Sequence, residues 1–182
     1  MKKYFSIIFL ILLISEASSE IKENIIQNLI NTNNISFDFE QSINGKTENG
    51  NCVIQYPKKI YCDYNTKDKK TLVSNGKVLV IQNKKNYYLY PLKRTPLNLI
   101  LDKNYILNQI RNSKERNVND KYINFKFFES ENEINIFFNK INFDLIGWQT
   151  LDIYQNLSIT FLSSIRKNQN INKNLFILPE QN

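Results

Sequence analysis

Hydrophobic and polar residues follow two different periods along the chain. In residues 20–31 (EIKENIIQNLIN), apolar side chains recur at positions 21, 25, 26, 29 and 30, the spacing of one face of an α-helix. From Ile35 the period changes to two, so that Ile35, Phe37 and Phe39 would share one face of a β-strand. The pattern therefore predicts an amphipathic first helix followed by β-structure.

Serial β-hairpins are predicted for most of the chain. Asn44-Gly45 and Asn75-Gly76 are the dipeptides that tight hairpin turns favour. Further strands are expected at residues 51–56, 59–64, 70–74, 77–82, 86–92, 122–129, 133–139, 146–154, 157–167 and 175–178. About ten or eleven strands joined in this way predict a mainly β protein with a large, strongly curled or barrel-like antiparallel sheet. We expect one domain over residues 20–182, because neither a repeat nor a linker interrupts it.

A helical insertion interrupts this pattern after residue 94. Thr95 is suited to the N-cap and Pro96 to the first helical position, and Leu97, Ile100 and Leu101 follow as an apolar cluster. Asp102 is suited to cap a second helical turn that carries the apolar residues 105, 106 and 110.

The two cysteines, Cys52 and Cys62, lie in strands expected to form one hairpin, "NCVIQYPKKIYC". A short loop around Tyr56-Pro57-Lys58 would place Cys52 opposite Cys62 and Ile54 opposite Ile60. Directly opposed residues of an antiparallel pair have Cα atoms ~4.5 Å apart, which suits a disulfide. A structural disulfide is the favoured interpretation, and two free core thiols or a redox pair are the alternatives.

The N-terminus is typical of a secretory signal peptide. Lys2 and Lys3 precede an apolar run of residues 5–14, and small residues follow at positions 15 and 17–19. The run is too short to span a membrane, which needs ~20 apolar residues, so a cleaved signal peptide is favoured and an uncleaved membrane anchor is the alternative. We therefore expect residues 1–19 to be removed and the protein to act in a bacterial periplasm.

Composition excludes several kinds of chemistry. The chain has no histidine, so Ser-His-Asp and Cys-His catalysis and most zinc sites are excluded. Neither a phosphate-binding glycine loop nor a nucleophile with an identifiable base is present, and the acids Glu129, Glu131 and Glu133 lie at a turn where solvated charge is expected. The sequence therefore predicts no enzyme activity, no metal site and no cofactor.

Charge adds one candidate surface. The formal net charge is +7, and the ten basic residues between Lys58 and Arg94 are accompanied by only two acids, Asp63 and Asp68. Lysines that keep strand edges soluble are the favoured explanation, and a surface for an acidic partner or anionic headgroups is the alternative. Nucleic acid is not expected as a partner, because no recognition motif is present.

Six segments, in order, carry a resemblance to a known family: "FDFEQSINGKTENG" (37–50), "YPKKIYCDY" (56–64), "LVSNGKVLVI" (72–81), "KRTPLNLIL" (93–101), "LIGWQTLDIYQNLSITF" (145–161) and "LFILP" (175–179). In their order and spacing the chain resembles the periplasmic outer-membrane lipoprotein carriers, the LolA family. The resemblance implies an unclosed antiparallel β-barrel whose first helix and helical insertion act as a lid over an apolar cavity.

The resemblance also implies a function and a site. A carrier of this family accepts triacylated lipoproteins from an inner-membrane ABC transporter and passes them to an outer-membrane receptor, and we expect a monomer. The residues that match its lid and cavity wall are Ile25, Leu29, Phe37, Phe39, Ile54, Tyr56, Ile60, Pro96 and Leu97. For each of these residues singly, ordinary core packing is the competing interpretation.

One position departs from the family pattern. The family commonly has an arginine directly before the proline of the 56–58 turn, tied to the lid, and this chain has Tyr56. Tyrosine carries no fixed charge and adds apolar area.

Three other functions are alternatives to a carrier. The first is an outer-membrane receptor of the same fold, which lacks support because there is no lipidated cysteine near the N-terminus. The second is a periplasmic lipid- or lipoprotein-sensing regulator, and the third and more distant one is a hydrolase.

Overall fold

The structure is a computed structural model that describes residues 20–118, 121–129, 132–151 and 154–181. The expected signal peptide, residues 1–19, lies outside the described residues. These described residues form eleven strands: β1 (Asn34–Ile43), β2 (Lys46–Gln55), β3 (Lys59–Tyr64), β4 (Thr71–Asn75), β5 (Val78–Gln82), β6 (Tyr87–Pro91), β7 (Glu115–Val118), β8 (Tyr122–Glu129), β9 (Asn132–Asn139), β10 (Leu145–Leu151) and β11 (Leu157–Lys167).

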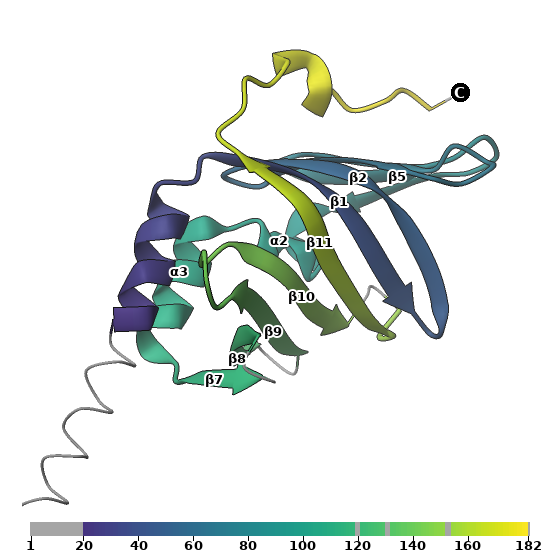
Figure 1. Cartoon of the computed structure of the whole chain (residues 1–182). Helices are drawn as coiled ribbons and strands as arrows, with labels where there is room; N and C mark the ends of the chain where they lie inside the picture. Colours follow the sequence, from purple (N-terminus) through teal and green to yellow (C-terminus); the bar gives the residue numbers. More distant parts are fainter. Residues whose placement is uncertain (1–19, 119–120, 130–131, 152–153, 182) are drawn as a thin grey trace, which may run out of the picture.

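All eleven strands form one antiparallel sheet in the order β6-β5-β4-β3-β2-β1-β11-β10-β9-β8-β7. Consecutive strands are neighbours in the sheet except β6 and β7, and β1 pairs with both β2 and β11, which brings the two halves of the chain together. Within the described residues, β6 and β7 are edge strands that do not pair with each other. The sheet curls strongly but does not close (Figure 1), so the predicted unclosed antiparallel barrel is confirmed.

The alternating pattern of the sequence sets which face of each strand is buried. In β1, Ile35, Phe37 and Phe39 are buried, whereas Asp38 and Glu40 are exposed. In the β2–β3 hairpin, Cys52 is opposite Cys62 and Ile54 is opposite Ile60, as predicted.

Helices lie on the concave side of the sheet. Residues 20–30 form the first helix, η1 (Leu92–Arg94) and α2 (Leu97–Ile100) lie within the curl, and α3 (Lys103–Asn112) packs beside the first helix (Figure 1). Lys22 Nζ donates to the Ser113 carbonyl at 2.7 Å, and Lys103 Nζ donates to the carbonyls of Ile30 and Thr32 at 3.1 and 2.9 Å. These bonds hold the first helix and α3 together as one layer.

The structure of the helical insertion confirms one predicted helix cap and differs from the prediction at the other. Asp102 caps α3 as predicted, because its carboxylate accepts from the Tyr105 amide at 3.1 Å. Thr95 is not the cap of α2: its hydroxyl donates back to the Leu92 carbonyl at 2.9 Å, and Pro96 occupies the cap position without a side-chain hydrogen bond. The Thr95 hydroxyl is buried, so the nearby carbonyl of η1 satisfies it.

The predicted strand at residues 175–178 is wrong, and β7 was not predicted. Asn172 caps a 3₁₀ turn, η2 (Lys173–Phe176), by accepting from the Asn174 amide at 3.0 Å. This turn packs on the outer face of β3 and β4, where Phe176 is buried. The polar sequence of β7, ERNV, has no alternation that would indicate a strand.

Candidate lipid-binding cavity

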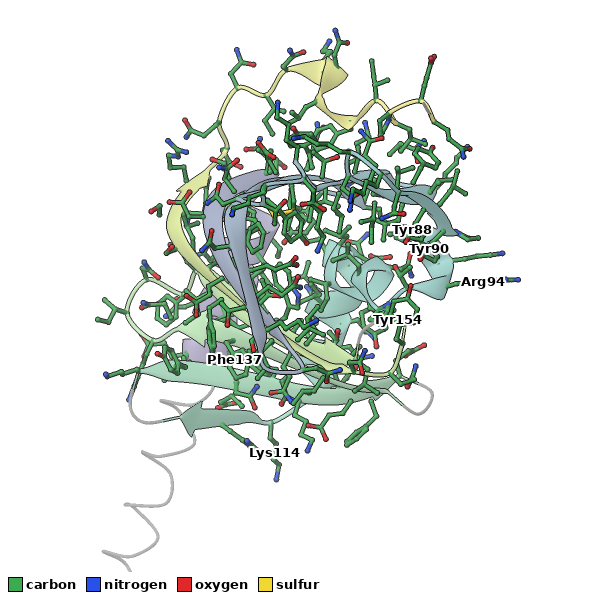
Figure 2. The ribbon with its side chains drawn as sticks, turned by 90° about the vertical axis from the view of Figure 1, so that its right-hand side faces the viewer. Tyr88, Tyr90, Arg94, Lys114, Phe137 and Tyr154 are labelled. Carbon is green, nitrogen blue, oxygen red and sulfur yellow. A yellow bond between two sulfur atoms is a disulfide. The ribbon has the colours of Figure 1, made fainter. Side chains whose placement is uncertain are left out.

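A cavity of about 490 Å³ lies between the concave face of the sheet and α2. Strands β1 to β6 form most of its wall, α2 covers one side, and β10 and β11 complete it. Its volume is within the range of ~300–1,000 Å³ that is typical of small-molecule sites. The strong curl of the sheet, which brings β10 and β11 to the same space as β4, β5 and β6, creates this cavity (Figure 2).

One part of the cavity wall is apolar. Phe37 and Trp148 meet edge-to-face with ring centroids 6.4 Å apart, and Phe39 and Tyr64 do so at 4.9 Å. The other aliphatic and cysteine side chains of the wall are Ile43, Cys52, Ile60, Cys62, Leu72, Leu79, Ile81, Pro96, Leu97, Ile100 and Leu151. This part of the wall could hold a hydrocarbon chain but offers little to a polar ligand.

A second part, toward the ends of β1, β2 and β4 that are remote from α3, is polar. Gln41 Nε2 donates to the hydroxyls of Ser158 and Thr160 at 3.3 and 3.1 Å. Lys70 pairs with Glu48 at 2.5 Å, and its Nζ also lies 4.1 Å from the centroid of the Tyr64 ring. Burial raises the pKa of the Tyr64 phenol, and the Glu48 charge raises it further. The cavity is therefore amphipathic, with an apolar part and a hydrogen-bonded polar part.

Tyrosines surround the opening of the cavity. Tyr88 and Tyr90 project from β6, and Tyr154 lies across from them in the connection between β10 and β11 (Figure 2). A hydrogen bond between Tyr90 and Tyr154 raises the pKa of Tyr90 to about 12, because the bond requires the Tyr90 proton. This contact connects two parts of the sheet that are far apart in strand order.

The sequence model of the family described as outer membrane lipoprotein carrier protein LolA matches residues 30–178 of this chain. The chain belongs to the LolA family. Members of this family are extracytoplasmic binding and carrier proteins rather than enzymes. Among curated proteins, none has a sequence that matches this chain.

Three solved structures illustrate the likeness in fold. A LolA superfamily protein from Nitrosomonas europaea is 9% identical, with 88% of this chain and 97% of that chain covered and a TM-score of 0.42. LprF from Mycobacterium bovis is 10% identical, with 87% and 97% covered and a TM-score of 0.47. The lipoprotein LppX from Mycobacterium tuberculosis is 8% identical, with 86% and 99% covered and a TM-score of 0.44. Family membership depends on the sequence match and not on these likenesses.

The structure brings some of the residues that match the LolA lid and wall to the cavity. Phe37, Phe39, Ile60, Pro96 and Leu97 line it, together with both cysteines. The cavity is not lined by the remaining four residues, which are Ile25, Leu29, Ile54 and Tyr56.

Those four residues pack the helices against the sheet instead. Ile25 and Ile54 are 0% exposed within the main core, and Leu29 is 4% exposed. Leu29 and Tyr56 also border a separate gap of about 10 Å³, which is too small for an acyl chain. Their position supports attachment of the lid more directly than contact with a ligand.

Tyr56, at the LolA arginine position, is half-buried beneath the helical layer. Its amide donates to the Asn33 carbonyl at 3.0 Å, and Lys103 Nζ lies 5.8 Å from the centroid of its ring. Burial raises the pKa of the Tyr56 phenol, so the side chain stays neutral. It therefore provides packing and no charge at this point.

A charged contact with the lid occurs two residues later, at Lys58. Lys58 Nζ lies 3.1 Å from Asp102 Oδ2, and the Lys58 amide donates to the Leu101 carbonyl at 3.0 Å. These two bonds attach the β2–β3 turn to the start of α3. The sequence places a lysine in the turn and an acid at the helix cap, but it contains no signal that the two would meet.

Cys52 and Cys62 form a disulfide with Cα atoms 4.1 Å apart, and it joins β2 to β3 in the cavity wall.

Across the described ranges, no three His, Cys, Asp or Glu side chains cluster so that they could hold a metal ion. No helix in the described part of the chain is long and apolar enough to cross a membrane.

Proposed function

We propose that this protein is a periplasmic carrier that shields the acyl chains of triacylated lipoproteins between an inner-membrane ABC transporter and an outer-membrane receptor. The observation that carries the proposal is the amphipathic cavity between the curled sheet and α2. Membership of the LolA family and the predicted signal peptide agree with this role.

The cavity volume matches the bulk of one acyl chain. If a methylene group occupies about as much space as a water molecule, ~30 Å³, a volume of 490 Å³ holds on the order of 16 such groups. The further chains of a triacylated cargo would then occupy the opening or require the helices to move away from the sheet.

The energetics favour such incomplete burial. At ~0.8 kcal/mol per methylene, one enclosed chain contributes on the order of 10 kcal/mol before the costs of binding are subtracted. Full burial of three chains would prevent release on a useful timescale. Keeping part of the cargo near the polar part of the cavity, around Gln41 and Lys70, limits the affinity and permits transfer.

Spheroplast release tests this function. Protein purified after export should release lipoproteins from spheroplasts as soluble one-to-one complexes. Leu97→Glu places a charge in the cavity wall and should abolish release, whereas Ile141→Glu changes a side chain that is 89% exposed and should leave release unchanged.

Failure of the parent protein to release lipoproteins, under conditions in which a known carrier works, would contradict the proposal. Recovery of free lipid instead of intact lipoprotein would favour the lipid-sensing alternative.

A further inference from the structure

Two loops at the end of the sheet remote from α3 are joined by hydrogen bonds. The β3–β4 loop (residues 65–70) and the β5–β6 loop (residues 83–86) lie side by side, because the Lys84 amide donates to the Asp68 carbonyl at 2.9 Å and Asn83 Nδ2 donates to Asp68 Oδ2 at 2.8 Å. The Asn83 side chain also accepts from the amides of Lys85 and Asn86 at 2.9 and 2.8 Å. We name these two loops the lysine tip.

The lysine tip carries four exposed cations, which are Lys67, Lys69, Lys84 and Lys85. Within the described residues, none of the four has a carboxylate partner, whereas Lys22, Lys58, Lys70, Lys126 and Lys167 all form ion pairs. Glu48 pairs with Lys70, and Asp68, which accepts from the neutral side-chain amide of Asn83, keeps its negative charge. Four lysines and one carboxylate leave the tip with a formal charge of 4 − 1 = +3.

Exposed apolar and aromatic groups follow the lysines directly. On β6, Tyr88 and Leu89 are 46% and 55% exposed, on opposite faces of an edge strand. Tyrosine beside lysine is the combination found where proteins meet the headgroup region of a bilayer, because the phenol ring has an apolar body and a polar end. Lysines that only keep an edge soluble would not need this apolar area beside them.

The lysine tip also borders the cavity. Asp68, Lys70, Asn83 and Asn86 from the two loops line its polar part, and Tyr88 lies at its opening (Figure 2). A flat surface that touches the tip would therefore face the opening through which an acyl chain enters or leaves.

We propose that the lysine tip, with Tyr88 beside it, is a docking surface for bilayers that contain anionic phospholipids. The four lysines contact the phosphate groups, and Tyr88 and Leu89 lie at the level of the headgroups. This inference goes beyond lipoprotein carriage and does not depend on it, since a sensor of membrane lipids would use the same surface.

Vesicle binding tests the proposal. Protein purified after export is mixed at low salt with vesicles of phosphatidylcholine alone, or of phosphatidylcholine with phosphatidylglycerol, and bound protein is measured by flotation. Binding should require phosphatidylglycerol and weaken as salt is added. Each lysine near an anionic surface strengthens binding about fivefold, so loss of three lysines alone weakens binding on the order of 100-fold. Because each glutamate also repels the surface, the K67E/K84E/K85E triple variant should bind at least about 100-fold more weakly.

A matched triple variant controls for net charge. K114E/K121E/K173E makes the same change in charge at three exposed lysines outside the tip, including Lys114, which lies far from Tyr88 in Figure 2, and should bind like the parent. Equal losses in the two variants would overturn the proposal, because net charge and not the tip would then be responsible. Absence of binding to the phosphatidylglycerol vesicles would also overturn the proposal. Spheroplast release is measured separately, so failure here leaves the carrier proposal intact.

Discussion

The ion pair between Lys58 and Asp102 should set how readily the helices separate from the sheet. At 3.1 Å, two unit charges in water attract by ~1.3 kcal/mol. Both side chains are about one third exposed, so solvent screening and lost side-chain freedom reduce the net contribution to about 0.5–1 kcal/mol. Removing the pair should therefore raise the population of the open lid about two- to fivefold, since 1.4 kcal/mol corresponds to a factor of ten.

The substitutions can isolate the charge from the helix cap. Asp102→Asn removes the charge but keeps an acceptor for the Tyr105 amide, because asparagine also caps helices well. Lys58→Gln removes the other charge and leaves the Lys58 backbone bond to Leu101 in place. Native-state hydrogen exchange at the backbone amide of position 58, whose bond to the Leu101 carbonyl joins the turn to the lid, then reports separation of the two.

A double-mutant cycle decides the outcome. Each single variant and the double variant should exchange to a similar extent, faster than the parent, and high salt should bring the parent toward them. Lys126→Gln is the control, because its pair with Glu133 lies between β8 and β9 and does not touch the helices. A coupling energy of zero, or the same acceleration in Lys126→Gln, would refute the role of Lys58.

Three further predictions concern the wall, the core and pH. Replacing both Cys52 and Cys62 with serine should lower the free energy of unfolding by up to ~2.5 kcal/mol, because the disulfide closes a short loop. Urea unfolding measures this change, and an unchanged free energy would show that the disulfide is not stabilising. Ile25→Ala should cost ~2–5 kcal/mol because the side chain is fully buried, whereas Leu97→Ala, at the cavity wall, should cost less than ~1.5 kcal/mol and instead weaken binding of an acyl probe; the reverse order would contradict the assigned cavity. Because the pKa of Tyr64 is raised in the folded protein, this phenol contributes its full stabilisation below the ordinary pKa of 10.0. Above that pH the free energy of unfolding should fall, since only the unfolded state then loses the phenol proton. Between about pH 8 and about pH 11, the free energy of unfolding of Tyr64→Phe, measured with urea, should fall less steeply than that of the parent, and an equal slope would rule out this phenol as the cause.

Local signals predicted the hairpins well, because their turns and their alternation lie within a few residues. Asn44-Gly45 forms the predicted turn, with both residues at positive φ, and β2 pairs with β3 in the predicted register. Pairing between β1 and β11, in which Ser36 is opposite Arg166, has no such signal. It is set by packing of the whole sheet, which a local pattern does not describe.

The candidate site was harder to predict than the fold for a related reason. Ile54 and Ile60 are directly opposite each other and point to the same concave face, yet only Ile60 lines the cavity. Alternation predicts which side chains point inward, but it does not say whether helices or empty space will lie above them. The contact of Lys58 with Asp102 depends on the same placement of the helices.

Quenching of Trp148 tests the central claim most directly. Trp148 is the chain's single tryptophan, it is 6% exposed, and it lines the cavity, so its fluorescence reports what enters there. A triacylated lipopeptide with brominated acyl chains should quench this fluorescence at a one-to-one ratio, and the same lipopeptide without bromine should bind without quenching. Tight binding of the brominated lipopeptide with unchanged fluorescence would place the acyl chains elsewhere and contradict the account.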